Sequence, residues 1–379
     1  MADGAFPGDD RVEGVETTLA RDLVAKGVAP DVAVGWATRT GQGWDTGQGH
    51  SGVGAEPIFD LASVTKPMTA VAMARSGLPR ETPLGEALEE ARGSRSEEAT
   101  VELLLAHRSG LEAHLPLHEK ILLGGEVDHA TVLRIVADAR RADAAGAVPA
   151  GGFAPIYSDL GYILAGEALA RAVVPARDAG EAIEWLVVDA LSTGRVPVEL
   201  GTARSLIAHG IRFEERVRKT EVVAWRGGEV RGQVHDENAW ALTGLGGSGH
   251  AGMFGTVSGV LAFGCAVLDA LEGRGGAFAG TDLSWLVAER PGGTLRAGFD
   301  GKSAPGPGVY TSCGDRASLA TFGHLGFTGT SLWIDPEAQA VVTLLTNRVH
   351  PTRDNHAIRT ARPVVHDQLF ALAARRRGA

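Results

Sequence analysis

The chain has 379 residues, of which 44% are hydrophobic and 22% are charged, and its formal net charge is −10. This length favours two domains or one large composite domain over a single small core. The acidic balance argues against a nucleic-acid-binding protein, which normally presents a basic face. Two cysteines are too few for a disulfide framework or a zinc site, and no stretch reaches the roughly 20 apolar residues of a membrane-spanning helix.

The N-terminal stretch MADGAFPGDDRVEG is acidic and lacks the apolar core of a secretory signal. We therefore expect a cytoplasmic location, unless an export segment was removed. Residues 12–26 place apolar side chains at helical spacing and predict an amphipathic first helix. Alternating Val32, Val34 and Trp36, followed by a Gly-rich turn, predict a strand that enters a hairpin.

Residues 59–70, FDLASVTKPMTA, contain the only Ser-x-x-Lys of the chain, at Ser63 and Lys66. We expect a helix to begin near Ser63, because Pro67 is tolerated only in an early turn, and residues three apart on a helix share a face. A serine hydroxyl needs a base to act as a nucleophile. Lysine can be that base where burial or a nearby cation lowers its pKa. The alternative is a helix-capping serine beside a solvated lysine.

Helical patterns dominate residues 80–285, whereas the last hundred residues are β-rich. Helices are expected at 100–107, 130–142, 159–174 and 256–271. SLWID, a PEAQ turn and AVVTLLTN predict an antiparallel hairpin, and Pro363 is expected to open a C-terminal helix that runs to about residue 376.

The simplest α+β assembly pairs the N-terminal hairpin with the C-terminal strands in one antiparallel sheet, flanked by the first and last helices. We expect residues 1–75 and 286–379 to form this discontinuous sheet domain. Residues 76–285 would then form a mainly helical inserted domain, with a catalytic cleft between the two.

Two further segments carry candidate chemistry. Tyr157-Ser158-Asp159 stands at the expected start of a helix, and His324-Leu325-Gly326 lies on an expected strand. With these segments the chain resembles the serine β-lactamase and penicillin-binding-protein superfamily, in particular the class C β-lactamase-like branch with its esterases and D-amino-acid peptidases. The Ser-x-x-Lys, Tyr-x-Asn and Lys/His-x-Gly motifs of that superfamily match in order, within a resemblance over roughly residues 12–376. It implies a β-lactamase/transpeptidase-like fold.

The resemblance also implies roles for individual residues. Ser63 would be the nucleophile and Lys66 its base partner, and Tyr157 would move the proton to the leaving group. His324 would line the opposite wall and polarise the substrate. The backbone N–H groups of Ser63 and Phe327 would form the oxyanion hole, where one donor is typically worth about 10²–10³ in rate.

Asp159, Gly326 and Thr328 are expected to contact the substrate. Asp159 departs from the family pattern, because β-lactamases usually carry Asn there, and a carboxylate cannot donate to a substrate carbonyl as an amide can. His324 likewise replaces the Lys of true β-lactamases. Both departures favour esterase-like or peptidase-like members.

The predicted function is that of a serine hydrolase acting on small esters or amides through an acyl-Ser63 intermediate, with D-amino-acid peptides or β-lactams as alternatives. The expected partner is thus a small ester or amide, with no nucleic acid and no membrane. Neither a metal nor an organic cofactor is expected. An alternative from another class is a catalytically silent binding or scaffold protein, and the sequence does not give the oligomeric state.

Two motifs are interpreted as non-catalytic. Gly244–Gly249 fits the G-x-G-x-x-G pattern of dinucleotide loops, but VHDENAWALT before it is no buried parallel strand. We interpret it as a flexible loop near the cleft. His235-Asp236-Glu237 lacks a second ligand cluster and is interpreted as a hydrogen-bonded loop rather than a metal site.

Overall fold

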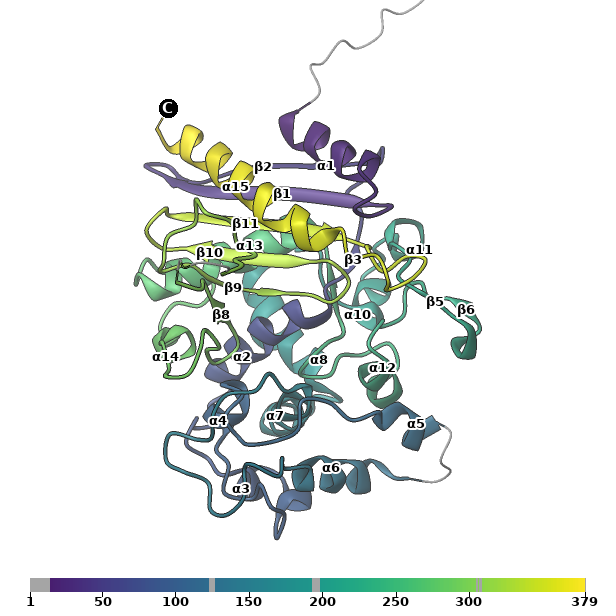
Figure 1. The fold of residues 1–379 in the computed structure, drawn as a ribbon, viewed down its shortest axis with the longest axis vertical. Helices are drawn as coiled ribbons and strands as arrows, with labels where there is room; N and C mark the ends of the chain where they lie inside the picture. The colour runs from purple at the N-terminus through teal and green to yellow at the C-terminus, as the bar shows by residue number, and fades with distance from the viewer. Residues whose placement is uncertain (1–13, 123–126, 193–197, 305, 307–308, 379) are drawn as a thin grey trace, which may run out of the picture.

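The computed structural model describes residues 14–122, 127–192, 198–304, 306 and 309–378. Most of the acidic N-terminal stretch lies outside these residues. The described chain forms an antiparallel sheet with two helices on one face and the remaining helices on the other side (Figure 1). The prediction of an α+β fold of the β-lactamase/transpeptidase type is confirmed.

The main sheet has six strands in the order β2-β1-β11-β10-β9-β8. Its strands are β1 (Val32–Thr40), β2 (Gly43–His50), β8 (Asp300–Gly301), β9 (Phe322–Leu325), β10 (Ser331–Asp335) and β11 (Ala340–Thr346). Both predicted hairpins are present, since β1 pairs with β2 and β10 pairs with β11, all antiparallel. The N-terminal and C-terminal hairpins join through β1 and β11, with Val34 opposite Leu344.

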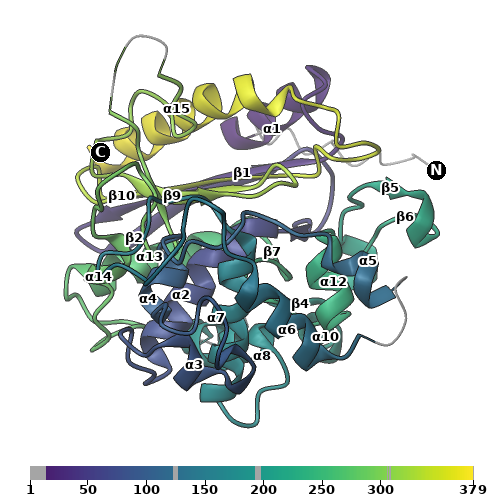
Figure 2. The same cartoon turned by 60° about the horizontal axis from the view of Figure 1, so that its bottom comes forward.

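The sheet separates two hydrophobic cores. Helices α1 (Val15–Ala25) and α15 (Ile358–Arg377) pack on one face, where Val34 and Leu344 belong to the smaller core. Helix α13 (Val257–Leu271) packs on the other face, against β1, β10 and β11. Figure 2 shows α1 and α15 above the edge-on sheet and the helical part below it. Such alternation of strand residues between two faces is the period-2 pattern read from the sequence.

The C-terminal helix begins at Ile358, five residues before the predicted start at Pro363. Pro363 therefore lies inside the helix, where it cannot donate a hydrogen bond to the carbonyl of Arg359 four residues earlier. The Tyr310 hydroxyl donates to that carbonyl instead. A partner some fifty residues away thus satisfies the group that proline leaves open.

The remaining helices and short strands form the helical part below the sheet. The helices are α2 (Thr65–Arg75), α3 (Leu84–Ala87), α4 (Val101–Leu105), α5 (Leu117–Leu122), α6 (His129–Asp138), α7 (Asp159–Ala172), α8 (Ala179–Ile183), α9 (Asp189–Leu191), α10 (Ala203–Ala208), α11 (Phe213–Arg216), α12 (Glu237–Thr243) and α14 (Ser284–Val287). The strands are β3 (Phe59–Asp60), β4 (Leu200–Thr202), β5 (Val222–Val223), β6 (Gly228–Glu229) and β7 (Met253–Gly255).

The domain limits at residues 75 and 286 stay a prediction. Helix α2, on the sheet side of that division, packs against α7 and α8, while α13, on its helical side, packs against the sheet. No helix among the described residues is long and apolar enough to cross a membrane.

The glycine-rich segment 244–249 follows α12 and packs tightly against α7 and α8, unlike the flexible loop expected. A side chain at Gly249 would meet the Tyr162 carbonyl, and one at Gly247 would meet the backbone of Gly180. Its glycines therefore permit close backbone approach. The packing brings the carbonyls of Gly249 and His250 to α2, where they accept from Thr69 and Lys66.

Candidate active site

Ser63 lies on a single 3₁₀ turn, Ala62–Val64, directly before α2. Ala62 has φ of +47°, a left-handed conformation that is unusual for a residue with a side chain. Asp60 holds this turn, because its buried carboxylate accepts 2.7 Å hydrogen bonds from the backbone N–H groups of Ala62 and His235. The nucleophile candidate thus sits on a strained turn tied to the loop that precedes α12.

Lys66 lies three residues after Ser63, in the first turn of α2, and is completely buried, at 0% exposure. Its Nζ donates to Ser63 Oγ (3.0 Å), Asp159 Oδ1 (2.8 Å) and the His250 carbonyl (3.2 Å). Three acceptors match the three N–H donors of an ammonium group. Burial acts to lower the pKa of Lys66, but the negative charge of Asp159 and the phenol of Tyr157 outweigh it and raise that pKa. The lowered pKa that a base role for Lys66 requires is therefore not found in the free protein.

Asp159 is the first residue of α7, and Ser158 caps the helix by accepting from the N–H of Gly161. Burial opposes the charged form of Asp159, yet Lys66 holds its pKa well below the ordinary value. The second oxygen, Oδ2, faces His114 Nδ1 at 3.9 Å. This interaction with Asp159 raises the pKa of His114. Asp159 is thus a carboxylate shared between the buried lysine and the cavity.

Tyr157 stands two residues before Asp159 and completes the group around Ser63. Its ring centroid lies 4.8 Å from Lys66 Nζ, and its hydroxyl interacts with both Lys66 and Ser63. Burial raises the pKa of Tyr157, and the positive charge of Lys66 only partly offsets that effect. The structure therefore brings Ser63, Lys66, Tyr157 and Asp159 together.

His107 fixes the position of the tyrosine from below. Its ring centroid lies 4.7 Å from that of Tyr157, and its Nδ1 accepts a 2.9 Å hydrogen bond from the N–H of Ser158. Burial lowers the pKa of His107 to about 3, so the ring is neutral. No pattern in the sequence indicates the contact of His107 with Tyr157, because 50 residues separate the two.

The strand β9 supplies the opposite side of the cleft. His324 is buried, its ring centroid is 5.8 Å from that of Tyr157, and its Nδ1 donates to the Leu325 carbonyl. Burial and the neighbouring Lys66 lower the pKa of His324 to about 3. His324 is therefore buried beside Tyr157 and is not among the residues that line the cavity, and its expected role in polarising the substrate stays a prediction.

The turn after β9 packs against the segment that carries Ser63. Gly326 has no room for a side chain, which would meet the Leu61 carbonyl and Thr330 Oγ1. Phe327 lines the cavity, and no acceptor among the described residues is assigned to its N–H. Thr328, expected to contact substrate, instead is buried and donates to the Asp60 carbonyl (2.8 Å). Its side chain therefore holds the turn against the nucleophile segment.

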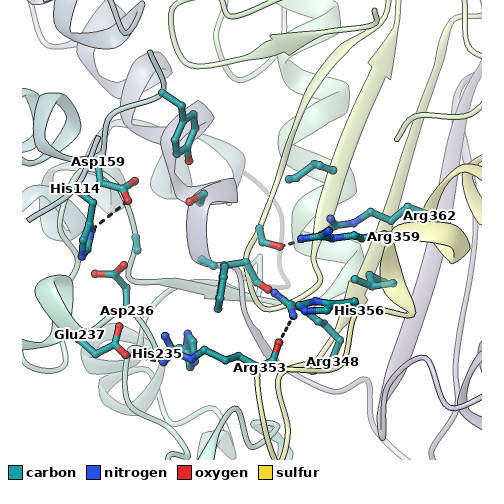
Figure 3. A pocket seen from close by; sticks show the side chains of 18 of the residues that line it. His114, Asp159, His235, Asp236, Glu237, Arg348, Arg353, His356, Arg359 and Arg362 are labelled. Carbon is teal, nitrogen blue, oxygen red and sulfur yellow. Dashed lines mark hydrogen bonds and ion pairs between the residues drawn. The ribbon is translucent and has the colours of Figure 1, made fainter. Parts of the chain in front are cut away.

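A cavity of about 680 Å³ opens above Ser63 and Tyr157. One wall carries His114, Asp159, Asp236 and Glu237, and the other carries Arg348, Arg353, Arg359 and Arg362 (Figure 3). We call these the acidic wall and the arginine wall. The predicted hydrogen-bonded loop His235–Glu237 thus lines the site. Among the described residues, no group of three or more His, Cys, Asp or Glu is placed to hold a metal ion.

Three of the four arginines on the arginine wall are already engaged. Arg348 donates to the Phe327 carbonyl, and Arg362 donates to the carbonyls of Gly326 and Thr330. Arg353 pairs with Glu221 and Glu237. The exposed guanidinium of Arg359 has no assigned partner among the described residues. The wall was missed in the sequence because its members are scattered along a loop and the first turns of α15.

This fold, with a serine and a buried lysine at the start of α2 beneath the β9 edge, defines a serine hydrolase of the β-lactamase/transpeptidase type. The chain belongs to the Beta-lactamase family, whose model matches residues 17–366.

Individual relatives are more distant. A putative D-alanyl-D-alanine carboxypeptidase from Salmonella agona (strain SL483) is 35% identical over 124 residues, which are 31% of this chain and 27% of that protein. A class C β-lactamase from Rhodobacter sphaeroides superposes with a TM-score of 0.62 at 17% identity, covering 93% of this chain and 99% of the other. A D-stereospecific amidohydrolase from Streptomyces sp. gives 0.60 at 15% identity, covering 93% and 98%. These structures show a shared fold.

Proposed function

We propose that the protein hydrolyses small esters or amides through an acyl intermediate on Ser63. The observation that carries this proposal is the contact of Ser63 Oγ, 3.0 Å from a fully buried ammonium, at the floor of a cavity of about 680 Å³. A surface lysine beside a capping serine would have been solvated. Burying a lysine is costly unless it is paired and hydrogen-bonded, and this one is held against the serine.

The ion pair with Asp159 keeps the proton on Lys66, so Tyr157 is left to accept the proton of Ser63. In the first step Ser63 Oγ attacks the substrate carbonyl as its proton passes to the Tyr157 phenolate, which the Lys66 ammonium stabilises. The N–H groups of Ser63 and Phe327 would hold the resulting oxyanion. Tyr157 then returns the proton to the leaving oxygen or nitrogen. In the second step Tyr157 accepts a proton from water, the water oxygen attacks the acyl carbonyl, and Tyr157 then returns the proton to Ser63 Oγ.

Covalent labelling tests this proposal. A fluorophosphonate probe should add to one site, mapped to Ser63 by peptide mass spectrometry, and Ser63→Ala should abolish the adduct. Benzylpenicillin, tested in parallel, should leave a penicilloyl adduct only if the cavity accepts β-lactams and releases them slowly. A folded protein that reacts with neither reagent would be a silent binding protein instead.

One observation favours a second candidate, the cleavage of peptides that end in a D-amino acid. Arg359 on the arginine wall, whose guanidinium has no assigned partner within the described part of the chain, could hold a terminal carboxylate, and the Salmonella relative is described as a putative D-alanyl-D-alanine carboxypeptidase. The test compares a peptide ending in D-Ala-D-Ala with its C-terminal amide. A preference for the free acid that Arg359→Ala removes, mainly through KM, supports this candidate. Equal turnover of both would leave the ester and amide proposal alone.

A further inference from the structure

The carboxylate of Asp159 sets the hydrogen-bond polarity of the cavity wall beside Lys66 and Ser63. A carboxylate accepts hydrogen bonds and cannot donate them, whereas an amide does both. Oδ1 of Asp159 is taken by Lys66, but Oδ2 has no donor at hydrogen-bonding distance among the described residues, because His114 Nδ1 is 3.9 Å away. Asp159 also lines the cavity. Oδ2 is therefore an acceptor on the cavity side of Asp159 whose one assigned partner among the described residues is the longer ion-pair contact with His114.

We propose that the acyl group of the substrate carries an unblocked amine next to the scissile carbonyl, and that Asp159 Oδ2 binds it as an ammonium. This inference rests on the proposed acyl-enzyme function and names the substrate class of that same site. Charge-assisted hydrogen bonds of this kind are shorter and stronger than neutral ones. An acylated amine keeps one N–H but carries no positive charge, and its added carbonyl places a second acceptor near the carboxylate, so it would bind there less well.

Asp236 supplies negative charge that Lys66 does not neutralise. Its Oδ1 accepts from His250 Nε2 and from the N–H of Ala239, both at 2.8 Å, and no donor among the described residues is assigned to Oδ2. Although burial opposes ionisation, His250 lowers the pKa of Asp236 to about 2, so the group is charged at neutral pH. Figure 3 places Asp236 beside Asp159 on the acidic wall. The two carboxylates together favour a cation there.

A matched set of three anilides tests this substrate class. The p-nitroanilides of D-alanine, N-acetyl-D-alanine and propionic acid share a leaving group and differ only in the amine, and the L-alanine forms are assayed in parallel. We expect kcat/KM for the free amine to exceed that for the N-acetyl compound by about 10-fold to 100-fold, the range of a hydrogen bond to a charged group. The propionyl compound, which has no group to donate, should fall between them.

Asp159→Asn provides the decisive variant, because it keeps the shape and adds a donor. The ratio of free-amine to N-acetyl kcat/KM should fall towards one or invert, whatever happens to the absolute rates. Asp128→Asn is the matched control, since Asp128 caps α6 on the surface and Asn also caps helices. This control should keep the wild-type ratio.

The inference is overturned if wild type cleaves the N-acetyl compound equally well or better, or if Asp159→Asn keeps the preference. If no anilide turns over while the fluorophosphonate still labels Ser63, the rates of Ser63 labelling by diphenyl 1-aminoethylphosphonate and its N-acetyl form give the same comparison. Failure of the fluorophosphonate itself to label folded protein would remove the proposed function, and this inference with it.

Discussion

The contact between Lys66 and Asp159 decides how protons are held at this site. An ammonium that donates to Asp159, Ser63 and the His250 carbonyl cannot also accept the proton of Ser63. The negative charge of Asp159 outweighs burial and raises the pKa of Lys66, and it adds to the burial that raises the pKa of Tyr157. The carboxylate therefore stabilises the resting, protonated state of both candidate bases.

This arrangement predicts an alkaline pH dependence. The base must be deprotonated to act, and the pKa values of Tyr157 and Lys66 are raised, so kcat/KM should increase with pH from neutrality into the alkaline range. Asp159→Asn removes the charge that raises both values, and its profile should therefore move to lower pH. The measurement is kcat/KM for p-nitrophenyl acetate against pH, corrected for spontaneous hydrolysis. A profile that stays in place or moves upward in Asp159→Asn would contradict this assignment.

Tyr157 is predicted to do the acid–base work. Tyr157→Phe keeps the ring that packs on His107 but removes the hydroxyl, and kcat should fall at least ~10²-fold, the usual contribution of a general acid–base group. Ser63→Ala and Lys66→Ala should abolish turnover. Steady-state rates with p-nitrophenyl acetate measure the loss. Tyr162→Phe is the matched control, because it removes a buried tyrosine hydroxyl that donates to the Leu105 carbonyl rather than to a group at Ser63. Full activity in Tyr157→Phe would assign the proton transfer elsewhere.

Sequence spacing predicted the meeting of Ser63 and Lys66, because a helix brings residues three apart to one face. The direction of the Lys66 pKa could not be predicted in the same way. It depends on Asp159, which is 93 residues away, and on Tyr157 beside it. Apolar neighbours along the chain indicate burial, but they do not show which charges the fold brings to the buried group.

Among the elements, the turn between β9 and β10 is held by several contacts to the segment that carries Ser63. Gly326 accepts from Arg362 through its carbonyl and lies against the Leu61 carbonyl, while Thr328 and Thr330 donate to the carbonyls of Asp60 and Leu61. These bonds join this end of β9 and β10 directly to the segment that carries Ser63. The Thr328 hydroxyl is used in this junction, which the motif alone did not indicate.

A side chain at Gly326 should disrupt this junction. Gly326→Ala places a methyl group against backbone and Thr330 Oγ1, and overpacking of this kind typically costs about 1–3 kcal/mol. We expect a lower free energy of unfolding in urea and a loss of kcat, because Phe327 N–H moves with the turn. Gly41→Ala is the matched control, since an added Cβ there meets nothing within 4 Å. Unchanged stability and rate in Gly326→Ala would contradict the close packing.

Local pattern located the main strands and the longer helices, and the misplaced start of α15 has a physical cause. The strands β1, β10 and β11 and the helices α6, α7 and α13 lie where periodicity and turn residues predicted them. The start of α15 was misplaced because proline usually marks the first turn of a helix. Here Tyr310 satisfies the Arg359 carbonyl that Pro363 leaves open. Compensation by a distant side chain has no signature in the local sequence.

At the scale of the whole molecule, each face of the sheet carries its own hydrophobic core. The core under α1 and α15 contains Val34, Val342 and Leu369, and it meets the cavity at Ile358, the first residue of α15. The core on the α13 face contains Val64 and Met68, which flank Lys66. Leu369 lies eleven residues further along α15 than Ile358 and does not line the cavity, so its packing is separate from the site.

This separation predicts a variant that loses stability without losing activity. Leu369→Ala empties a completely buried position on α15, and such a truncation typically costs about 2–5 kcal/mol. We expect a lower urea midpoint with kcat/KM within a factor of about two at 25 °C, since additivity holds for distant sites. Val364→Ala on the exposed side of α15 is the matched control. A parallel loss of kcat/KM in Leu369→Ala would show that the two cores are coupled.

Asp60 has a consequence for how this enzyme could change its substrates. One carboxylate oxygen fixes the turn that presents Ser63, and the other fixes the backbone of His235, from which Asp236 and Glu237 extend along the acidic wall. The attacking group and the wall that we propose to read the acyl group are therefore anchored to a single side chain. A change in the backbone of residues 235–237 would therefore also move the turn that carries Ser63. New selectivity at this wall should evolve more readily by exchange of side chains than by insertion or deletion in the loop.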